Sequence, residues 1–183
     1  IRIYNTCAGP HYVRKARSQD VDRWFGQGRD PQRHPLDDLY AFENAPESLA
    51  RELLEEGITA MKIWPFDRAA FANRGVGITT AQIRAGLDSF QRIRRAVGTE
   101  MDLMVELHAL WDVNSAKQII RAVEEINPLW IEDPVRPDDQ RALQELARYT
   151  RVPLLVSETL APAASFLPLV QAPETGILCF DPG

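Results

Sequence analysis

The chain has 183 residues, of which 45% are hydrophobic and 26% are charged, a composition typical of a globular protein. Its net charge of −5 argues against a nucleic-acid partner, which usually faces a basic surface. These residues contain neither an apolar stretch near the roughly 20 residues of a membrane span nor the pattern of a signal peptide. The cysteines Cys7 and Cys179 are interpreted as reduced thiols. We therefore expect a cytoplasmic protein with no nucleic-acid or membrane partner.

The two ends of the chain fall inside strand-like segments. It begins with Ile1-Arg2-Ile3-Tyr4, without an initiator methionine, and stops at Gly183 directly after an apolar run. We interpret the chain as a piece of a larger protein.

Strand-like apolar runs recur along the chain, separated by stretches with helical spacing. Because such alternation builds parallel sheets, it predicts either a (β/α)8 barrel or an open doubly wound sheet. A whole barrel has eight strands and about 250 residues, so we predict a partial barrel with about strands one to six and their intervening helices. The expected strands are Ile1–Thr6, Ala60–Trp64, Asp102–Leu107, Leu129–Glu132, Leu154–Glu158 and Gly176–Asp181.

Capping residues predict where the helices begin and end. The first helix is expected to begin after the cap Asn44, at Pro46, and to stop at Gly57. The second is expected to have Thr80 as its cap and to stop at Gly98. The third is expected to begin at Ser115 or Asn114, and a fourth carries Leu143 and Leu146. The charged segment His11–Phe42 is interpreted as a long loop, which either hangs over a site or is simply solvated.

Three of the apolar runs end in a glutamate. Glu106, Glu132 and Glu158 are spaced by 26 residues both times, which suits one strand, one crossover helix and two loops. A similar spacing occurs in leucine-rich repeats, but their L-x-x-L-x-L pattern is missing. Parallel strands deliver their ends to one edge, where three carboxylates would repel each other without a cation. We predict a site for a hard ion such as Mg²⁺, Mn²⁺ or Ca²⁺, although a single such glutamate is often only a loop residue.

Two residues of the strand before the first glutamate are also candidates. Lys62 lies in an apolar run, so it needs a partner if it is buried. Beside a metal it would bind a substrate carboxylate or act as a base; otherwise it extends to solvent at the sheet edge. Trp64 is expected on the same face, where it would line a pocket or simply join the core.

Further candidates lie at the same expected edge. His108 follows Glu106 by two residues, so strand alternation places both on one face, where His108 suits a general acid or base. Asn5 would bind substrate or close a turn. Asp181 would hydrogen-bond a histidine from a following strand.

Together these segments resemble the enolase superfamily, and within it the mandelate racemase and muconate lactonizing enzyme family, on its acid-sugar dehydratase branch. The matching motifs are Met61-Lys62-Ile63, Val105-Glu106-Leu107-His108, Trp130-Ile131-Glu132-Asp133-Pro134 and Ser157-Glu158-Thr159.

The resemblance implies a role for each candidate. Glu106, Glu132 and Glu158 would hold one Mg²⁺ ion, with Mn²⁺ as a substitute, and Lys62 would be a base or carboxylate partner. His108 would be the acid for a departing hydroxyl. Asp181 matches the aspartate of the family's His-Asp dyad.

Three departures from the family pattern qualify these roles. Trp64 stands where the family often has a second lysine, which makes racemisation by two opposed bases a weaker hypothesis. The dyad histidine is expected beyond Gly183, and the N-terminal capping domain before Ile1. We therefore interpret residues 1–183 as an incomplete C-terminal barrel domain that is inactive in isolation.

The function expected from the resemblance is that of a Mg²⁺-dependent dehydratase of a small sugar acid. It would abstract the proton α to a carboxylate, pass through an enediolate and eliminate water to give a 2-keto-3-deoxy acid. The alternatives are a racemase, epimerase or cycloisomerase of the same superfamily, and a non-catalytic metal-binding barrel. The family also implies a homo-oligomer.

Overall fold

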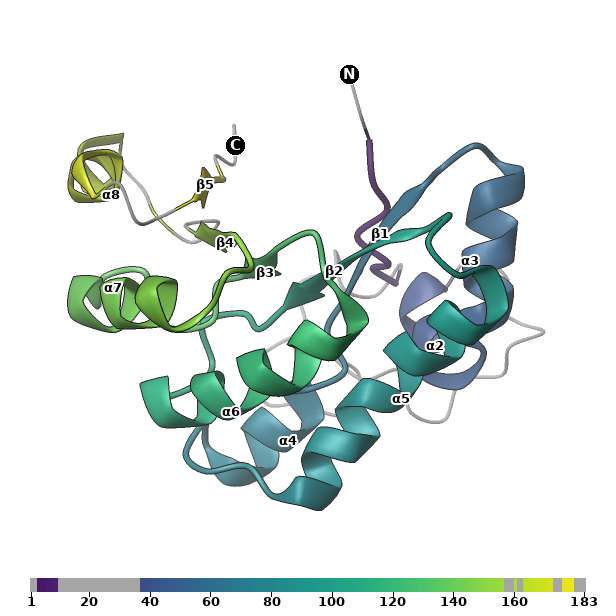
Figure 1. The fold of residues 1–183 in the computed structure, drawn as a ribbon, viewed down its shortest axis with the longest axis horizontal. Coiled ribbons are helices and arrows are strands. Elements are labelled where there is room, and N and C mark those ends of the chain that lie inside the picture. The colour runs from purple at the N-terminus through teal and green to yellow at the C-terminus, as the bar shows by residue number, and fades with distance from the viewer. Residues whose placement is uncertain (1–2, 10–36, 157–159, 161–162, 173–175, 180–183) are drawn as a thin grey trace.

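A parallel sheet forms the centre of the molecule in the computed structural model, which describes residues 3–9, 37–156, 160, 163–172 and 176–179 (Figure 1). Within these residues the sheet has five strands in chain order, and every neighbouring pair is parallel. The sheet is not closed, and its order is that of consecutive units of a (β/α)8 barrel. The predicted α/β class and partial barrel are confirmed. The strands are β1 (Ala60–Ile63), β2 (Asp102–Glu106), β3 (Ile131–Glu132), β4 (Leu154–Val156) and β5 (Ile177–Leu178).

Helices fill the connections between the strands. Figure 1 shows α5, α6 and α7 along the same face of the sheet, as expected when each crossover has the same hand. The helices are α2 (Asp38–Asn44), α3 (Pro46–Glu55), α4 (Asp67–Asn73), α5 (Thr80–Val97), α6 (Val113–Val123), α7 (Gln140–Tyr149) and α8 (Leu167–Gln171), with 3₁₀ turns η1 (Glu124–Ile126) and η2 (Ala163–Phe166).

The first expected strand is shorter than predicted. In residues 3–9, only Asn5 pairs with the sheet, by a parallel bridge to Met61. The Asn5 N–H donates to the Ala60 carbonyl at 3.0 Å, and the Lys62 N–H donates to the Asn5 carbonyl at 2.8 Å. Cys7 then has φ 51°, outside the β region, so the strand geometry does not continue.

Three predicted helix starts were displaced by one or more residues. Ala45, not Asn44, precedes α3, and the Asn44 amide instead donates to the Tyr40 carbonyl at 2.8 Å. Thr79, not Thr80, caps α5 through a capping box with Gln82. The first residue of the third helix is preceded by Asp112, whose side chain accepts from the Ser115 N–H. For the second and third of these helices, the polar residue whose side chain accepts from a free backbone N–H decides the start, whereas α3 has no side-chain cap and begins at Pro46.

The predicted helix stops are confirmed. After α3, Gly57 has φ 82°; its N–H donates to the Leu54 carbonyl, and the next N–H, from Ile58, donates to Leu53. This pair of bonds is a Schellman motif, which requires the left-handed conformation that glycine adopts without strain. The segment expected as a loop through Phe42 ends in helix α2, and its residues 11–36 lie outside the described part of the chain.

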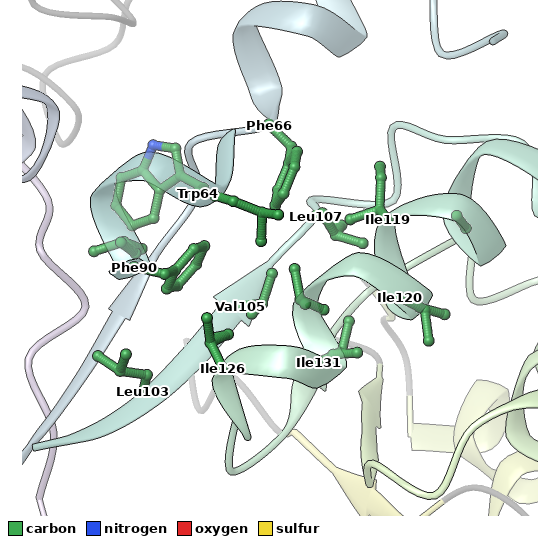
Figure 2. Packing of buried hydrophobic residues seen from close by; sticks show 14 of the residues in the cluster. Trp64, Phe66, Phe90, Leu103, Val105, Leu107, Ile119, Ile120, Ile126 and Ile131 are labelled. Carbon is green, nitrogen blue, oxygen red and sulfur yellow. The ribbon is translucent and has the colours of Figure 1, made fainter. Parts of the chain in front are cut away.

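The apolar core lies between the sheet and its helices. Figure 2 shows Val105 and Leu107 from β2 and its end, and Ile131 from β3, in one cluster with Ile119 and Ile120 of α6, while Leu103 lies at the other end of β2, on the side of Phe90. These sheet residues alternate along their strands, so the residues between them face the other side of the sheet. The core therefore fixes which side chains remain for a site.

One arginine joins α5 to the segments that lead into β2 and β3. The Arg94 guanidinium donates to four backbone carbonyls, at distances of 2.6–3.3 Å: Gly98, Met101, Ile126 and Asn127. These segments enter β2 and approach β3, so Arg94 fixes the ends of the strands opposite the glutamates. Among the described residues, no helix is long and apolar enough to cross a membrane.

Candidate active site

Lys62, Glu106 and Glu132 lie together on the face of the sheet opposite the helices. The register pairs Glu106 with Glu132 directly, and Ile63 with Val105 on the apolar face. All three charged side chains are buried, with 5%, 0% and 1% of their surfaces exposed. The structure brings Lys62 into contact with two of the three glutamates expected to meet. We refer to these three residues as the carboxylate cluster.

The Lys62 ammonium bridges the two carboxylates. Its Nζ donates to Oε2 of Glu106 at 2.8 Å and to Oε1 of Glu132 at 2.5 Å. Trp130, two residues before Glu132 and on the same face, donates its Nε1–H to Oε2 of Glu132 at 3.1 Å. Two carboxylates and one ammonium leave a formal charge of −2 + 1 = −1 in a buried place. Such an excess is costly unless further positive charge is present.

The pKa values express this imbalance. Burial alone would lower the pKa of Lys62, but the charges of Glu106 and Glu132 outweigh it and raise that pKa above its ordinary value. The pKa of Glu132 is raised to about 7, first by burial and then by repulsion from Glu106, against the attraction of Lys62. The attraction of Lys62 therefore does not offset the effects of burial and of Glu106 on the pKa of Glu132.

His108 lies beside Glu106, but for a different reason than predicted. β2 ends at Glu106, and His108 has φ 49°, so strand alternation does not extend to it. The backbone N–H groups of Leu107 and His108 both donate to Oε1 of Glu106, at 3.0 and 2.8 Å. The turn of the chain around the carboxylate, rather than strand geometry, places His108 next to the cluster.

The His108 ring contacts two residues from the loop after β1. Its Nδ1 lies 2.7 Å from Oδ2 of Asp67, and its ring meets that of Trp64 edge to face, with 5.4 Å between centroids. Trp64 is 2% exposed and also meets Phe42 edge to face at 5.2 Å. Trp64 therefore forms a wall behind His108, and its contact with substrate stays a prediction.

Asn5 uses its side chain within the protein. Its Oδ1 accepts from the Cys7 N–H at 2.5 Å, and its Nδ2 donates to Oδ2 of Asp38 at 2.8 Å. The first bond forms an Asx turn, which corresponds to the second of the two roles expected from the sequence. A role for Asn5 in binding substrate stays a prediction.

Two residues of the site were missed in the sequence. Trp130 could have been found by the alternation that links it to Glu132. Asp67 follows the lysine strand by only a few residues, and an acid close to a strand end is the signal that marked the glutamates. Its partnership with His108 depends on a turn after β2 that the sequence pattern does not reveal.

The described donors suit a hard divalent cation. Glu106 and Glu132 present carboxylate oxygens side by side, and burial followed by repulsion from Glu106 raises the pKa of Glu132. No group of three potential ligands is close enough to hold a metal among the residues that the structure describes. Glu158, the expected third ligand, and Asp181 of the expected dyad both lie outside those residues. The three-glutamate site therefore stays a prediction.

Similar proteins include enzymes that act on sugar acids. A D-gluconate/D-galactonate dehydratase from Picrophilus torridus is 31% identical over 113 residues, which cover 62% of this chain and 28% of that protein. A D-gluconate dehydratase from Thermoproteus tenax is 28% identical over 144 residues, which cover 79% of this chain and 26% of the relative. The chain thus spans only about a quarter of the length of these curated relatives.

Solved structures give the same relationship. An enolase of the mandelate racemase subgroup from Agrobacterium tumefaciens is 41% identical, with a TM-score of 0.69, over 71% of this chain and 36% of that one. An enolase from the Sargasso Sea environmental genome is 36% identical, with a TM-score of 0.72, over 75% of this chain and 37% of that one. Residues 46–183 match the family described as enolase C-terminal domain-like. The chain belongs to this family of the enolase superfamily, with sugar acid dehydratases among its relatives.

Proposed function

We propose that the intact protein is a Mg²⁺-dependent acid-sugar dehydratase. It removes the proton α to a carboxylate and, from the enediolate, eliminates the β-hydroxyl as water to give a 2-keto-3-deoxy acid. One observation carries the proposal: the Glu106 carboxylate is contacted by Lys62 on one oxygen and by the His108 backbone on the other. A ligand, a cationic group and a potential acid thus share one place. The dehydratases among the relatives support this reaction class.

Glu106, Glu132 and Glu158 are the residues that would hold the metal. A Mg²⁺ ion bound by them would supply the positive charge that stabilises negative charge developing on the substrate carboxylate. Lys62 keeps its proton while both carboxylates face it, so in that state it attracts the anionic substrate. It would serve as a base once other positive charge offsets Glu106 and Glu132.

His108 would act after the α-proton has been removed. It lies at the end of β2, beside Glu106 and against Trp64, which shields one side of its ring. A protonated imidazole can give a proton to the oxygen of a departing hydroxyl group. In this assignment, the removal of the α-proton and the loss of water are two successive steps, and His108 serves only the second.

The test is a turnover assay with the intact protein. Aldonic and aldaric acids, including D-gluconate and D-galactonate, are incubated with Mg²⁺, and the 2-keto acid is measured. We expect turnover of at least one acid, with a loss of more than about 10²-fold in Glu132→Gln. The control is Glu145→Gln, since Glu145 forms an exposed pair with Lys117. Unchanged turnover in Glu132→Gln would exclude the metal role of that residue.

An epimerase is the second candidate, because a solved relative belongs to the mandelate racemase subgroup. In D₂O, an epimerase would place deuterium at the α-carbon and release no 2-keto acid. Conversion abolished by a chelator would exclude a non-catalytic barrel. These three outcomes are distinct in one proton NMR experiment.

The cytoplasmic location, the homo-oligomeric state and the inactivity of residues 1–183 alone also belong to this proposal. Light scattering of the intact protein tests the oligomer, and fractionation of its native host tests the location. The isolated chain would need its own turnover assay. Activity equal to that of the intact protein would contradict the expected inactivity.

A further inference from the structure

Asp67 is a buried acid in direct contact with the ring of His108. It lies three residues beyond Trp64, at the first position of α4, and its side chain is fully buried. Its Oδ2 lies 2.7 Å from Nδ1 of His108. The contact joins the loop after β1 to the loop after β2, across 41 positions of sequence.

The backbone around His108 is held in an unusual conformation. His108 and Ala109 have φ 49° and 56°, so two successive residues with side chains lie in the left-handed region. The His108 N–H donates to Oε1 of Glu106 at 2.8 Å, and the Ala109 N–H donates to the Asp133 carbonyl at 2.7 Å. Such conformations persist where the surroundings over-determine them, often at functional sites. The backbone and the ring of His108 are thus fixed independently.

We propose that Asp67 is the positioning residue of His108. An ionised carboxylate only accepts hydrogen bonds, so Asp67 places the neutral imidazole's hydrogen on Nδ1. Nε2 is then the nitrogen that exchanges a proton with the substrate. This inference rests on the proposed dehydratase function, in which His108 is the acid for the departing hydroxyl.

The proton balance of that step is simple. The electron pair of the enediolate forms the new carbon–carbon double bond, while the bond from the β-carbon to the hydroxyl oxygen breaks. The oxygen keeps the pair from that bond and takes the Nε2 proton of the imidazolium, leaving as water. The neutral ring retains its Nδ1 hydrogen, which is directed at Oδ2 of Asp67. Asp67 acts through His108 and touches no reacting atom.

A purely structural role would require only that Asp67 join the two loops. The distinguishing variant is Asp67→Asn in the intact protein, which keeps size and a hydrogen-bonding group but can donate to Nδ1. The matched control is Asp112→Asn. Asp112 lies in the same loop as His108, but its side chain caps α6 by accepting from the Ser115 N–H at 2.7 Å. Asparagine serves as well as aspartate at a helix cap, so this control should leave function unchanged.

Two readouts separate the roles. In ¹⁵N NMR of the imidazole rings, with His108 assigned by loss of its signals in His108→Gln, we expect hydrogen on Nδ1 in the wild type and a shift toward Nε2 in Asp67→Asn. In the kinetic assay, we expect kcat for water loss to fall about 10²- to 10⁴-fold in Asp67→Asn, with KM changed less than about threefold. Exchange of the α-proton with D₂O should continue in that variant, because it precedes the step that His108 serves.

The outcomes keep this inference apart from the proposed function. If the wild type dehydrates a sugar acid but Asp67→Asn is as active as Asp112→Asn, the positioning role is overturned. If no acid is dehydrated, the proposed function fails, whereas the NMR measurement still decides whether Asp67 fixes the tautomer. Hydrogen on Nε2 in the wild type overturns the inference even if Asp67→Asn does not fold. Asp67→Glu restores the carboxylate, so partial recovery of kcat over Asp67→Asn would support it.

Discussion

The Nζ atom of Lys62 lies 2.8 Å from Oε2 of Glu106, although the two residues are 44 positions apart. Parallel pairing of β1 and β2 brings them to one face of the sheet, and Lys62 reaches a carboxylate on β3 as well. We therefore expect the charge of Lys62 to contribute to the stability of the fold.

Removing the ammonium should destabilise the protein. Lys62→Met leaves two buried carboxylates facing each other, and breaking a buried pair costs about 3–5 kcal/mol. The control Lys117→Met removes an exposed pair with Glu145 and should change the free energy of unfolding by less than about 1 kcal/mol. Urea unfolding of the intact protein in a chelator measures both. Equal effects in the two variants would show that the carboxylate cluster contributes no more than a surface pair.

The stability should also depend on pH through Glu132. Its pKa is raised from 4.5 to about 7 in the folded state, mainly by burial and by Glu106. Because the folded-state pKa is the higher one, its protonation favours folding; this contribution is complete below pH 4.5 and is lost as the pH rises through about 7. At about 1.4 kcal/mol per pKa unit, the loss is roughly 3 kcal/mol in a metal-free solution. Urea titrations at several pH values measure it.

The variant Glu132→Gln isolates that dependence. Glutamine cannot ionise, so the fall in unfolding free energy between pH 4.5 and about 7 should be smaller in the variant by roughly the amount assigned to Glu132. The same slope in both proteins would assign the dependence to other groups.

Divalent cations should stabilise the intact protein. An ion that binds the folded state raises the unfolding temperature with its concentration, and Glu106→Gln or Glu132→Gln should remove most of that shift. Mn²⁺ binding followed by electron paramagnetic resonance gives a second readout that does not depend on activity. Glu145→Gln, in an exposed pair, serves as the control. If Glu106→Gln and Glu132→Gln both kept the thermal shift, the ion would bind at a site that does not include these glutamates.

The packing of the loops opposite the site depends on Arg94. Two of its four backbone acceptors belong to the buried residues Met101 and Ile126, and they lose their donor when the guanidinium is removed. We expect Arg94→Gln to cost about 2–4 kcal/mol of unfolding free energy. The neighbouring Arg95 is exposed, so Arg95→Gln should change it by less than about 0.5 kcal/mol. Chemical denaturation compares the two, and similar losses would contradict a special role for Arg94.

Strand periodicity was enough to predict the fold and the core of the candidate site. Lys62, Glu106 and Glu132 share a face because alternation and parallel pairing leave little freedom. It failed where the chain leaves regular geometry. His108 lies in a left-handed turn, and its contact with Asp67 joins two loops whose paths are set by tertiary packing. The cap of α5 moved by one residue because both Thr79 and Thr80 are suitable, and only the bond to Gln82 decides between them.

The chain-ordered sheet has a consequence for how the protein is made. From β2 onward, each strand pairs with the strand that precedes it in the chain, so that neighbour has already been synthesised when the strand leaves the ribosome. The bond between Lys62 and Glu132 spans 70 positions and passes over β2, so it closes only when a third unit has emerged. Until then Lys62 faces one carboxylate and the pair is neutral, and the arrival of Glu132 adds the excess negative charge.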